Sequence, residues 1–265
     1  MRIALLLALL SCLSAVRGQV MVMPKDFNHN AKVKLVDEFF ERFNGQEITP
    51  YIDRSRADYR KLNLLSLFNI GMFKSRQDTL YLKADTLMDV ILTDGVRIAY
   101  ADSLWFARAR CRAVVDGHKT DITLWLSVEP RGDGMFKWVI ARAEGKALEL
   151  AAPATAHEAM LLPTDHETNF ISLHRMTSDT PHQALSFARK DFSPDPTTVF
   201  FALVYAGKLK IESMSDLSFR FLQVPGYEFY IHYFERDKAN CGWLISSFAH
   251  MSEREKQLFI QKMHE

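Results

Sequence analysis

Hydrophobic residues recur at helical spacing in the first third of the chain. Residues 31–43, 57–69 and 79–92 each place aromatic or aliphatic side chains three or four positions apart, which is the pattern of an amphipathic helix. Asn44-Gly45 follows the first segment, and this pair is typical of a helix C-terminus. The pattern therefore predicts three helices ahead of any strand.

The spacing of apolar residues then changes to a period of two. Residues 104–114, 122–128 and 136–140 alternate apolar with polar side chains, and turn-forming Gly and Asp residues lie at the two connections. Such alternation is typical of antiparallel strands with one face on a core. The segment predicts a three-stranded meander.

A second block of helix and strand patterns follows. Residues 149–168 contain two prolines and an Ala-rich stretch, and we interpret them as a linker. Asp195 is suited to cap a helix over residues 196–206, and Ser252 with Glu255 forms a capping box for a last helix. Between these two helices, strand patterns return at residues 217–224, 227–235 and 243–249.

The two strand blocks are similar in sequence. The stretch that begins at Trp138 resembles the one that begins at Trp243, and residues 102–106 resemble residues 216–221. An internal duplication explains the similarity, although any two meanders share alternation. We therefore predict an α+β fold in which helices pack on curved antiparallel sheets in two related cone-like units. The first unit would span residues 19–148 and the second residues 169–265.

Alternation also predicts which way the tryptophans face. Trp138 shares a strand face with Ile140, as Trp243 does with Ile245, so we expect both in helix-covered cores. Trp125 is out of phase with its apolar neighbours. We expect it to face away from the core, where its removal would cost little stability.

Helices followed by a long antiparallel sheet resemble the nuclear transport factor 2-like superfamily, also called the cystatin-like α+β cone. Residues 31–43, 80–92 and 104–142 carry this resemblance, which covers roughly residues 28–148. It implies the fold and a pocket between helices and sheet. It implies no reaction, because the superfamily includes enzymes, transport adaptors and exported proteins.

The N-terminus has the pattern of a signal peptide over residues 1–18. Arg2 precedes a short apolar run, and Gly18 is a small residue suited to cleavage. The run is shorter than the roughly 20 residues that span a bilayer, so we expect no transmembrane segment after cleavage. Lipidation at Cys12 is the alternative. We expect an exported protein, periplasmic or secreted, and the Gly-Gln junction also resembles exported proteins of Bacteroides-type bacteria.

Composition limits the partners of the protein. The 265 residues carry a net charge of +1, which argues against a general polyanion binder, and we expect no nucleic-acid partner. After cleavage only Cys111 and Cys241 remain, too few for a disulfide framework. We expect Cys111 to be a small buried hydrophobic residue and the two cysteines to be unbonded.

The candidate binding residues lie on polar strand faces. Arg108, Arg110 and Arg112 alternate along one strand face. They either pair with carboxylates on neighbouring strands or form a basic patch for an anionic glycan or phosphate group, together with Arg54, Arg56, Arg60 and Lys61. Tyr230 and His232 share the polar face of another strand, which is either a small binding surface or a solvated sheet face. With Trp125, the three strand arginines, Tyr230 and His232 are the six residues we assign to a binding surface.

Catalytic and metal-binding patterns are weak. Tyr100 and Asp102 could reach a cone mouth, but no pair of ionisable residues occupies an inward strand face of the first block, as acid–base chemistry would need. Eight-residue gaps separate His166, His174 and His182, which does not favour a metal site. We expect no cofactor and no metal.

These observations favour an exported envelope protein that binds a protein or small-molecule partner without catalysis. Two alternatives stay open. One is a small-molecule enzyme of the isomerase or dehydratase type that uses a cone pocket. The other is a structural subunit of an envelope assembly.

The signal peptide generates the first testable prediction. N-terminal sequencing of the exported protein should begin at Gln19, because Gly18 is the small residue that ends the signal pattern. A mature chain that begins at a lipidated Cys12 would contradict it.

Overall fold

The computed structural model describes residues 32–33, 35–46, 57–150, 192–236 and 240–264, together with residues 185, 188 and 189. Residues 31–265 form one compact unit. The predicted signal peptide, Cys12, Arg54, Arg56, the three evenly spaced histidines and all but the first two residues of the predicted linker lie outside the described residues.

The three helices predicted near the N-terminus are present. They are α2 (Val36–Phe43), α3 (Tyr59–Leu65) and α4 (Thr79–Thr93), with a short 3-10 helix, η1 (Ile70–Met72), before the last. The Asp78 carboxylate caps α4 by accepting from the Leu80 amide at 3.1 Å. Helix α2 begins later than predicted because residues 32–33 form strand β1 (Lys32–Val33), which pairs in parallel with β7 (Cys241–His250).

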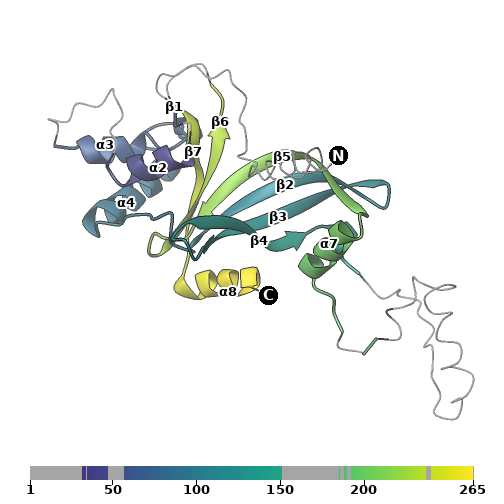
Figure 1. Cartoon of the computed structure of the whole chain (residues 1–265). Coiled ribbons are helices and arrows are strands. Elements are labelled where there is room, and N and C mark those ends of the chain that lie inside the picture. Colours follow the sequence, from purple (N-terminus) through teal and green to yellow (C-terminus); the bar gives the residue numbers. More distant parts are fainter. Residues whose placement is uncertain are drawn as a thin grey trace, which may run out of the picture. The chain divides into compact units, whose positions relative to one another are not determined.

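The predicted α+β class is confirmed, and the strands form one sheet. The first meander comprises β2 (Trp105–Val115), β3 (His118–Pro130) and β4 (Phe136–Glu144), which is followed by the 3-10 helix η2 (Lys146–Leu148). The second comprises β5 (Leu209–Phe221), β6 (Tyr227–Phe234) and β7. The strand order is β1-β7-β6-β5-β2-β3-β4, antiparallel throughout except for β1 (Figure 1).

The two expected cone-like units are not confirmed. Every residue of β2 has an antiparallel partner on β5, from Trp105 opposite Phe221 to Val115 opposite Leu209, so the two meanders join edge to edge. Two register shifts interrupt this ladder. They explain why the first half of β5 was not predicted from the sequence. A bulge interrupts the alternation of apolar and polar residues from which strands are predicted.

The helices before the first meander dock on the second one. Phe39 of α2 packs against Phe221 and Phe229, with ring centroids 5.7 and 6.1 Å apart. The Ile245 amide of β7 donates to the Leu67 carbonyl at 2.7 Å. Helices from one predicted unit therefore cover strands of the other, which ties both halves into a common core.

The main core is aromatic. Trp105 stacks on Phe221, and Phe221 stacks on Phe229, with centroids 5.4 and 4.8 Å apart. Trp243 is 2% exposed in this cluster and Trp138 packs against it, as predicted. Phe and Trp side chains thus fill the space between α2–α4 and the sheet.

Helix α7 (Pro196–Tyr205) closes a second core cluster at the other end of the same sheet face. The Asp195 carboxylate accepts from the amides of Thr197 and Thr198, so the predicted cap is confirmed. Cys111 lies in this cluster. Cys111 and Cys241 are both free and buried, as expected.

Helix α8 (Glu253–His264) covers part of the opposite sheet face. Ser252 and Glu255 form the predicted capping box, with reciprocal bonds of 2.8 and 3.3 Å to backbone amides. Trp125 does face away from the main core, but the expectation that it is dispensable there is wrong. It is 8% exposed because Phe259 of α8 packs against its ring.

The tryptophans provide a test of this packing. Trp243→Ala and Trp125→Ala should each lower the free energy of unfolding by about 3–5 kcal/mol, because each removes a buried ring and leaves a cavity. Trp138→Ala should cost less, since Trp138 is only half-buried on the edge strand β4. Urea denaturation of the three variants gives the comparison. A loss below about 1 kcal/mol for Trp125→Ala would show that α8 does not bury this side chain.

Candidate functional site: the polar face of the sheet

The candidate site begins with three arginines on one face of β2. Alternation directs Arg108, Arg110 and Arg112 to the face opposite the alanines and Cys111, which enter the core. Arg110 and Arg112 are exposed, and Arg108 is half-buried. We call these three residues the arginine stripe, and the sheet face that carries them the polar face.

The neighbouring strands surround each arginine differently. Arg110 lies between Thr123 of β3 and Asp216 of β5. In the same way, Asp121 and Ser213 flank Arg112. These two arginines therefore have a carboxylate on an adjacent strand, although neither makes an ion pair within the described part of the chain.

Arg108 has no acidic neighbour directly opposite. It lies between Trp125 of β3 and Ser218 of β5, and its guanidinium carbon is 5.7 Å from the centroid of the Trp125 ring. This cation–π contact places the charge beside an aromatic face, and no carboxylate pairs with Arg108 among the described residues.

Ser218 is fully buried, and its hydroxyl oxygen has no hydrogen-bond partner in the described structure. The strand registers place it opposite Arg108 on one side and His232 of β6 on the other. We call Arg108, Ser218 and His232 the central row. A buried hydroxyl without a partner costs about 1–3 kcal/mol of desolvation, so this position is unfavourable for folding alone.

His232 is held in one orientation. Its Nδ1 lies 2.6 Å from the Ser246 hydroxyl, which donates to the Tyr230 carbonyl at 3.1 Å. A serine hydroxyl has one hydrogen and a carbonyl only accepts, so Nδ1 carries the proton and donates to Ser246. The other ring nitrogen, Nε2, is then left to act as an acceptor when the ring is neutral and as a donor when it is protonated.

Burial lowers the pKa of His232 below its ordinary value. The Asp216 carboxylate acts in the opposite direction, and the Arg108 guanidinium adds to the lowering. The ring therefore favours its neutral form in the protein without ligand.

The cations under α8 are paired, in contrast to the stripe. Arg220 makes an ion pair with Glu228, donating through Nε at 2.7 Å, and its guanidinium lies 3.8 Å from the centroid of Phe259. The same guanidinium lies 5.3 Å from the centroid of the Tyr230 ring. This arrangement holds α8 on the sheet.

A second group anchors α8 to β3 and β4. Glu144 accepts from Trp125 Nε1 at 3.3 Å and from Arg142 Nε at 3.1 Å, and it pairs with Lys262 of α8 at 3.1 Å. Burial raises the pKa of Glu144, but the hydrogen bonds from Lys262, Trp125 and Arg142 outweigh it and hold the pKa below its ordinary value. These charges therefore serve the docking of a helix.

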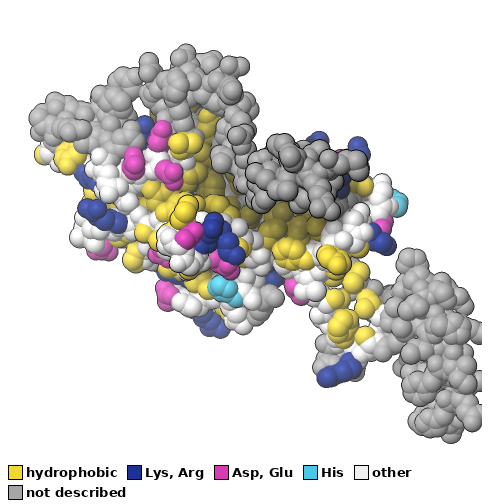
Figure 2. Space-filling view, viewed as in Figure 1, with side chains coloured by type: hydrophobic (Ala, Val, Ile, Leu, Met, Phe, Trp, Pro, Cys, Tyr) yellow, Lys and Arg dark blue, Asp and Glu magenta, His cyan; other side chains and the backbone are white. Residues whose placement is uncertain are grey.

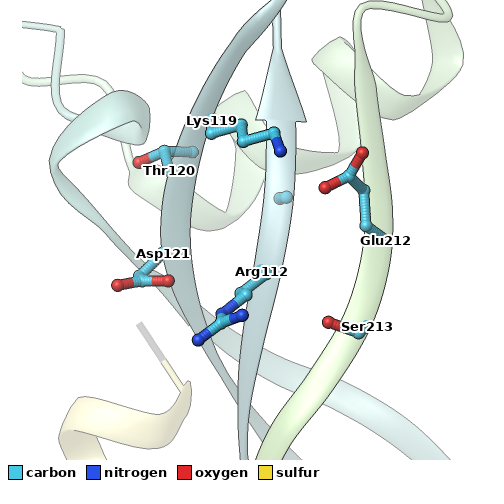
Figure 3. Close-up of a pocket in the computed structure, with 7 residues that line it drawn as sticks. Arg112, Lys119, Thr120, Asp121, Glu212 and Ser213 are labelled. Atoms are coloured by element: carbon cyan, nitrogen blue, oxygen red, sulfur yellow. The ribbon is translucent and has the colours of Figure 1, made fainter.

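A pocket of about 410 Å³ lies at the end of the stripe (Figure 3). Arg112 of β2 lies at its centre, between Asp121 of β3 and Ser213 of β5. Lys119 and Glu212 extend over it from the two flanking strands. The pocket is polar and mixed in charge, so it extends the stripe without adding an apolar binding surface.

A second pocket, of about 320 Å³, lies between α4 and the β6–β7 end of the sheet. Its walls include Lys83 of α4 with Tyr227 and His250, whose rings lie 5.7 Å apart. It is remote from the stripe along the sheet and has no candidate residue from the sequence.

The structure brings all six sequence-predicted residues to the polar face. The strand registers place Arg108 beside Trp125, and the buried Ser218 links Arg108 to His232. Tyr230 belongs to the next row along β6. Trp125 is largely covered by α8.

Sequence reasoning missed Ser218, Arg220 and Ser246. Ser218 and Arg220 alternate with Leu217, Phe219 and Phe221, so the polar face of β5 could have been identified. The partner strand could not, because alternation carries no information on strand order. Asp102 serves a turn, since its carboxylate accepts from the Leu104 amide at 2.9 Å.

Two further findings concern metal ions and membranes. No group of three or more His, Cys, Asp or Glu side chains in the described part of the chain is placed to hold a metal ion. Among the described helices, none is both long enough and apolar enough to cross a bilayer.

Comparison with known proteins finds no match for this chain. No family model matches the chain, and neither a curated protein nor a solved structure shows significant similarity to it.

The environment of His232 predicts a pH effect on stability. The unfolded chain takes up a proton near pH 6.5, whereas the folded protein does so only at lower pH, so the unfolded state binds more protons in between. The urea midpoint should therefore fall as the pH decreases from about 7 to about 5, and His232→Gln should reduce that fall. The exposed His118→Gln is the control. An equal pH dependence in His232→Gln and the unaltered protein would contradict the assignment.

Proposed function

We propose that this protein is an exported, non-catalytic binding protein that holds an anionic ligand on the arginine stripe. One observation carries the proposal. Three arginines occupy consecutive positions on one strand face without an ion pair in the described residues, while Arg220 and Arg142 on the same face each have a carboxylate partner. Like charges about 7 Å apart repel each other, and a bound anion relieves that repulsion.

The spacing of the stripe favours an extended ligand. Alternate residues of a strand are about 6.8 Å apart, so the three guanidinium groups follow one another over about 14 Å. A polymer with regularly spaced acidic groups, such as an acidic glycan, matches this spacing of guanidinium groups better than a single small ion does. The pocket at Arg112 adds Lys119 at the end of the same path.

The core side of the sheet supports binding rather than catalysis. An isomerase or dehydratase of the cone type needs ionisable groups in an interior pocket. In the described residues, that space holds stacked rings such as Phe39, Phe221 and Phe229. The isomerase alternative therefore rests only on the second pocket, where Lys83, Tyr227 and His250 lie at the edge of this space.

A structural subunit of an envelope assembly stays the second candidate. Helix α7 is apolar on its outer side as well, and Figure 2 shows hydrophobic side chains exposed over it. Phe201 and Val204 are exposed, and Tyr205 is 96% exposed. A protein that acts only as such a subunit would bind no soluble anion.

Export and family are part of the same proposal. Export to the periplasm or the exterior rests on the signal pattern of residues 1–18. The proposed relation to the nuclear transport factor 2-like superfamily, and the proposed duplication, rest on helices that precede each meander. Trp138 and Trp243 support the duplication, since each is the third residue of the third strand of its meander and faces the core.

The stripe is tested with polygalacturonate, a polymer of carboxylated sugars, as the probe. Arg110→Gln with Arg112→Gln should weaken its binding about tenfold, because two charge-assisted contacts at exposed positions contribute up to about 1 kcal/mol each. Calorimetric titration of the full mature chain at two salt concentrations gives the affinity, and the double variant should also show a weaker salt dependence.

The matched control removes the same charge elsewhere. Arg76→Gln with Lys83→Gln changes two exposed cations in the α4 region, away from the polar face. Equal losses of polygalacturonate affinity in both double variants would show that net charge alone explains the effect. Absence of binding by the unaltered protein would overturn the proposal for this class of ligand.

A further inference from the structure

The central row brings three polar side chains together across three strands. Arg108 of β2 is directly opposite Ser218 of β5, and Ser218 is directly opposite His232 of β6. Adjacent strands lie about 4.8 Å apart, so the three Cα atoms lie within about 10 Å. All three side chains leave the sheet on the polar face.

Ser218 is the observation that points to a ligand. Its hydroxyl is fully buried and has no partner in the described structure, while an alanine would fit the same position without an unsatisfied group. The strand registers place Ser218 between Arg108, which has no carboxylate directly opposite, and His232, whose Nε2 makes no hydrogen bond among the described residues. Arg108 and His232 thus flank the unpartnered hydroxyl along the row, while the Arg108 guanidinium lies beside Trp125 of β3.

The donors of the row match one oxyanion. Arg108 offers N–H groups with a full positive charge, Ser218 offers one O–H, and His232 offers Nε2–H when it is protonated. Ser246 keeps the ring oriented through Nδ1, so Nε2 stays available.

We propose that Arg108, Ser218 and His232 bind one carboxylate or phosphate group of the anionic ligand. The inference rests on the proposed function and specifies where on the polar face the ligand is fixed. The rest of the stripe then adds charge attraction along the strand, and the central row sets the position of the ligand.

If this site binds an anion, Ser218→Ala should make the protein more stable and its anion binding weaker. Ser218→Ala removes an unsatisfied buried hydroxyl, so its urea midpoint should rise in the absence of anion. The same variant should bind acetate or inorganic phosphate several-fold more weakly, because the anion loses the hydrogen bond from the Ser218 hydroxyl. Thr123→Ala, on the same face beside Arg110, is the control and should change neither quantity in this way.

His232 serves as the reporter of occupancy. The charged and titratable groups around it are Arg108 of β2, Asp216 of β5 and Tyr230 of β6. A bound anion stabilises the imidazolium form, so the pKa of His232, measured by NMR titration of the full mature chain, should rise when acetate or inorganic phosphate is added. Arg108→Gln should abolish that rise, and Arg112→Gln should leave it.

The outcomes separate the two proposals. A rise with acetate alone identifies a carboxylate site, and a rise with phosphate alone identifies a phosphate site. Polygalacturonate binding that depends on Arg110 and Arg112, together with a His232 pKa that neither anion changes, would overturn the central row and leave the stripe. An unchanged pKa with no polymer binding would overturn both.

Discussion

The antiparallel pairing of β2 with β5 is the constraint on which the rest of the structure depends. It joins two meanders that are separated by a long stretch of chain and gives the sheet a common core face and a common polar face. Once these strands are paired, Trp105 must stack on Phe221, and the helices near the N-terminus must cover strands from the C-terminal half. The same ladder brings Arg108 against Ser218 and, through β5, close to His232. Core and candidate site are therefore consequences of one register.

The two faces of this sheet are stabilised by different interactions. The core face is covered by α2–α4 and α7, and aromatic packing dominates there. The polar face is covered only in part, by α8, which contacts it through a cation–π contact at Phe259 and the charged group around Glu144. Each charge under the helix has a partner, as burial requires. The stripe continues beyond the helix, where solvent screens unpaired charge and the lack of partners is tolerated.

The sequence allowed us to predict which residues share a strand face, but not which strands lie next to each other. Alternation on β2 assigned Arg108, Arg110 and Arg112 to one face and Cys111 to the other, and both assignments hold in the structure. Alternation describes one strand at a time, however, and strand order depends on contacts between distant segments. The sequence therefore could not reveal that Ser218 lies beside Arg108, that α8 buries Trp125, or that bulges hide the start of β5. Those features follow from tertiary packing, which overrides local pattern.

The physical distinction between a structural and a binding role is clearest at the central row. Arg220 and Arg142 are satisfied within the protein, and removing either partner would leave a charge that the fold must accommodate. Ser218 is in the reverse situation, because its buried hydroxyl has no hydrogen-bond partner in the described structure and the folded state would be more stable without it. A site that binds must keep some of its hydrogen-bonding capacity unused, and this unused capacity opposes folding. The central row combines a buried hydroxyl, an imidazole nitrogen and a guanidinium that make no hydrogen bond or ion pair in the part of the chain that the structure describes. These groups occupy adjacent positions, where one anion could satisfy them together.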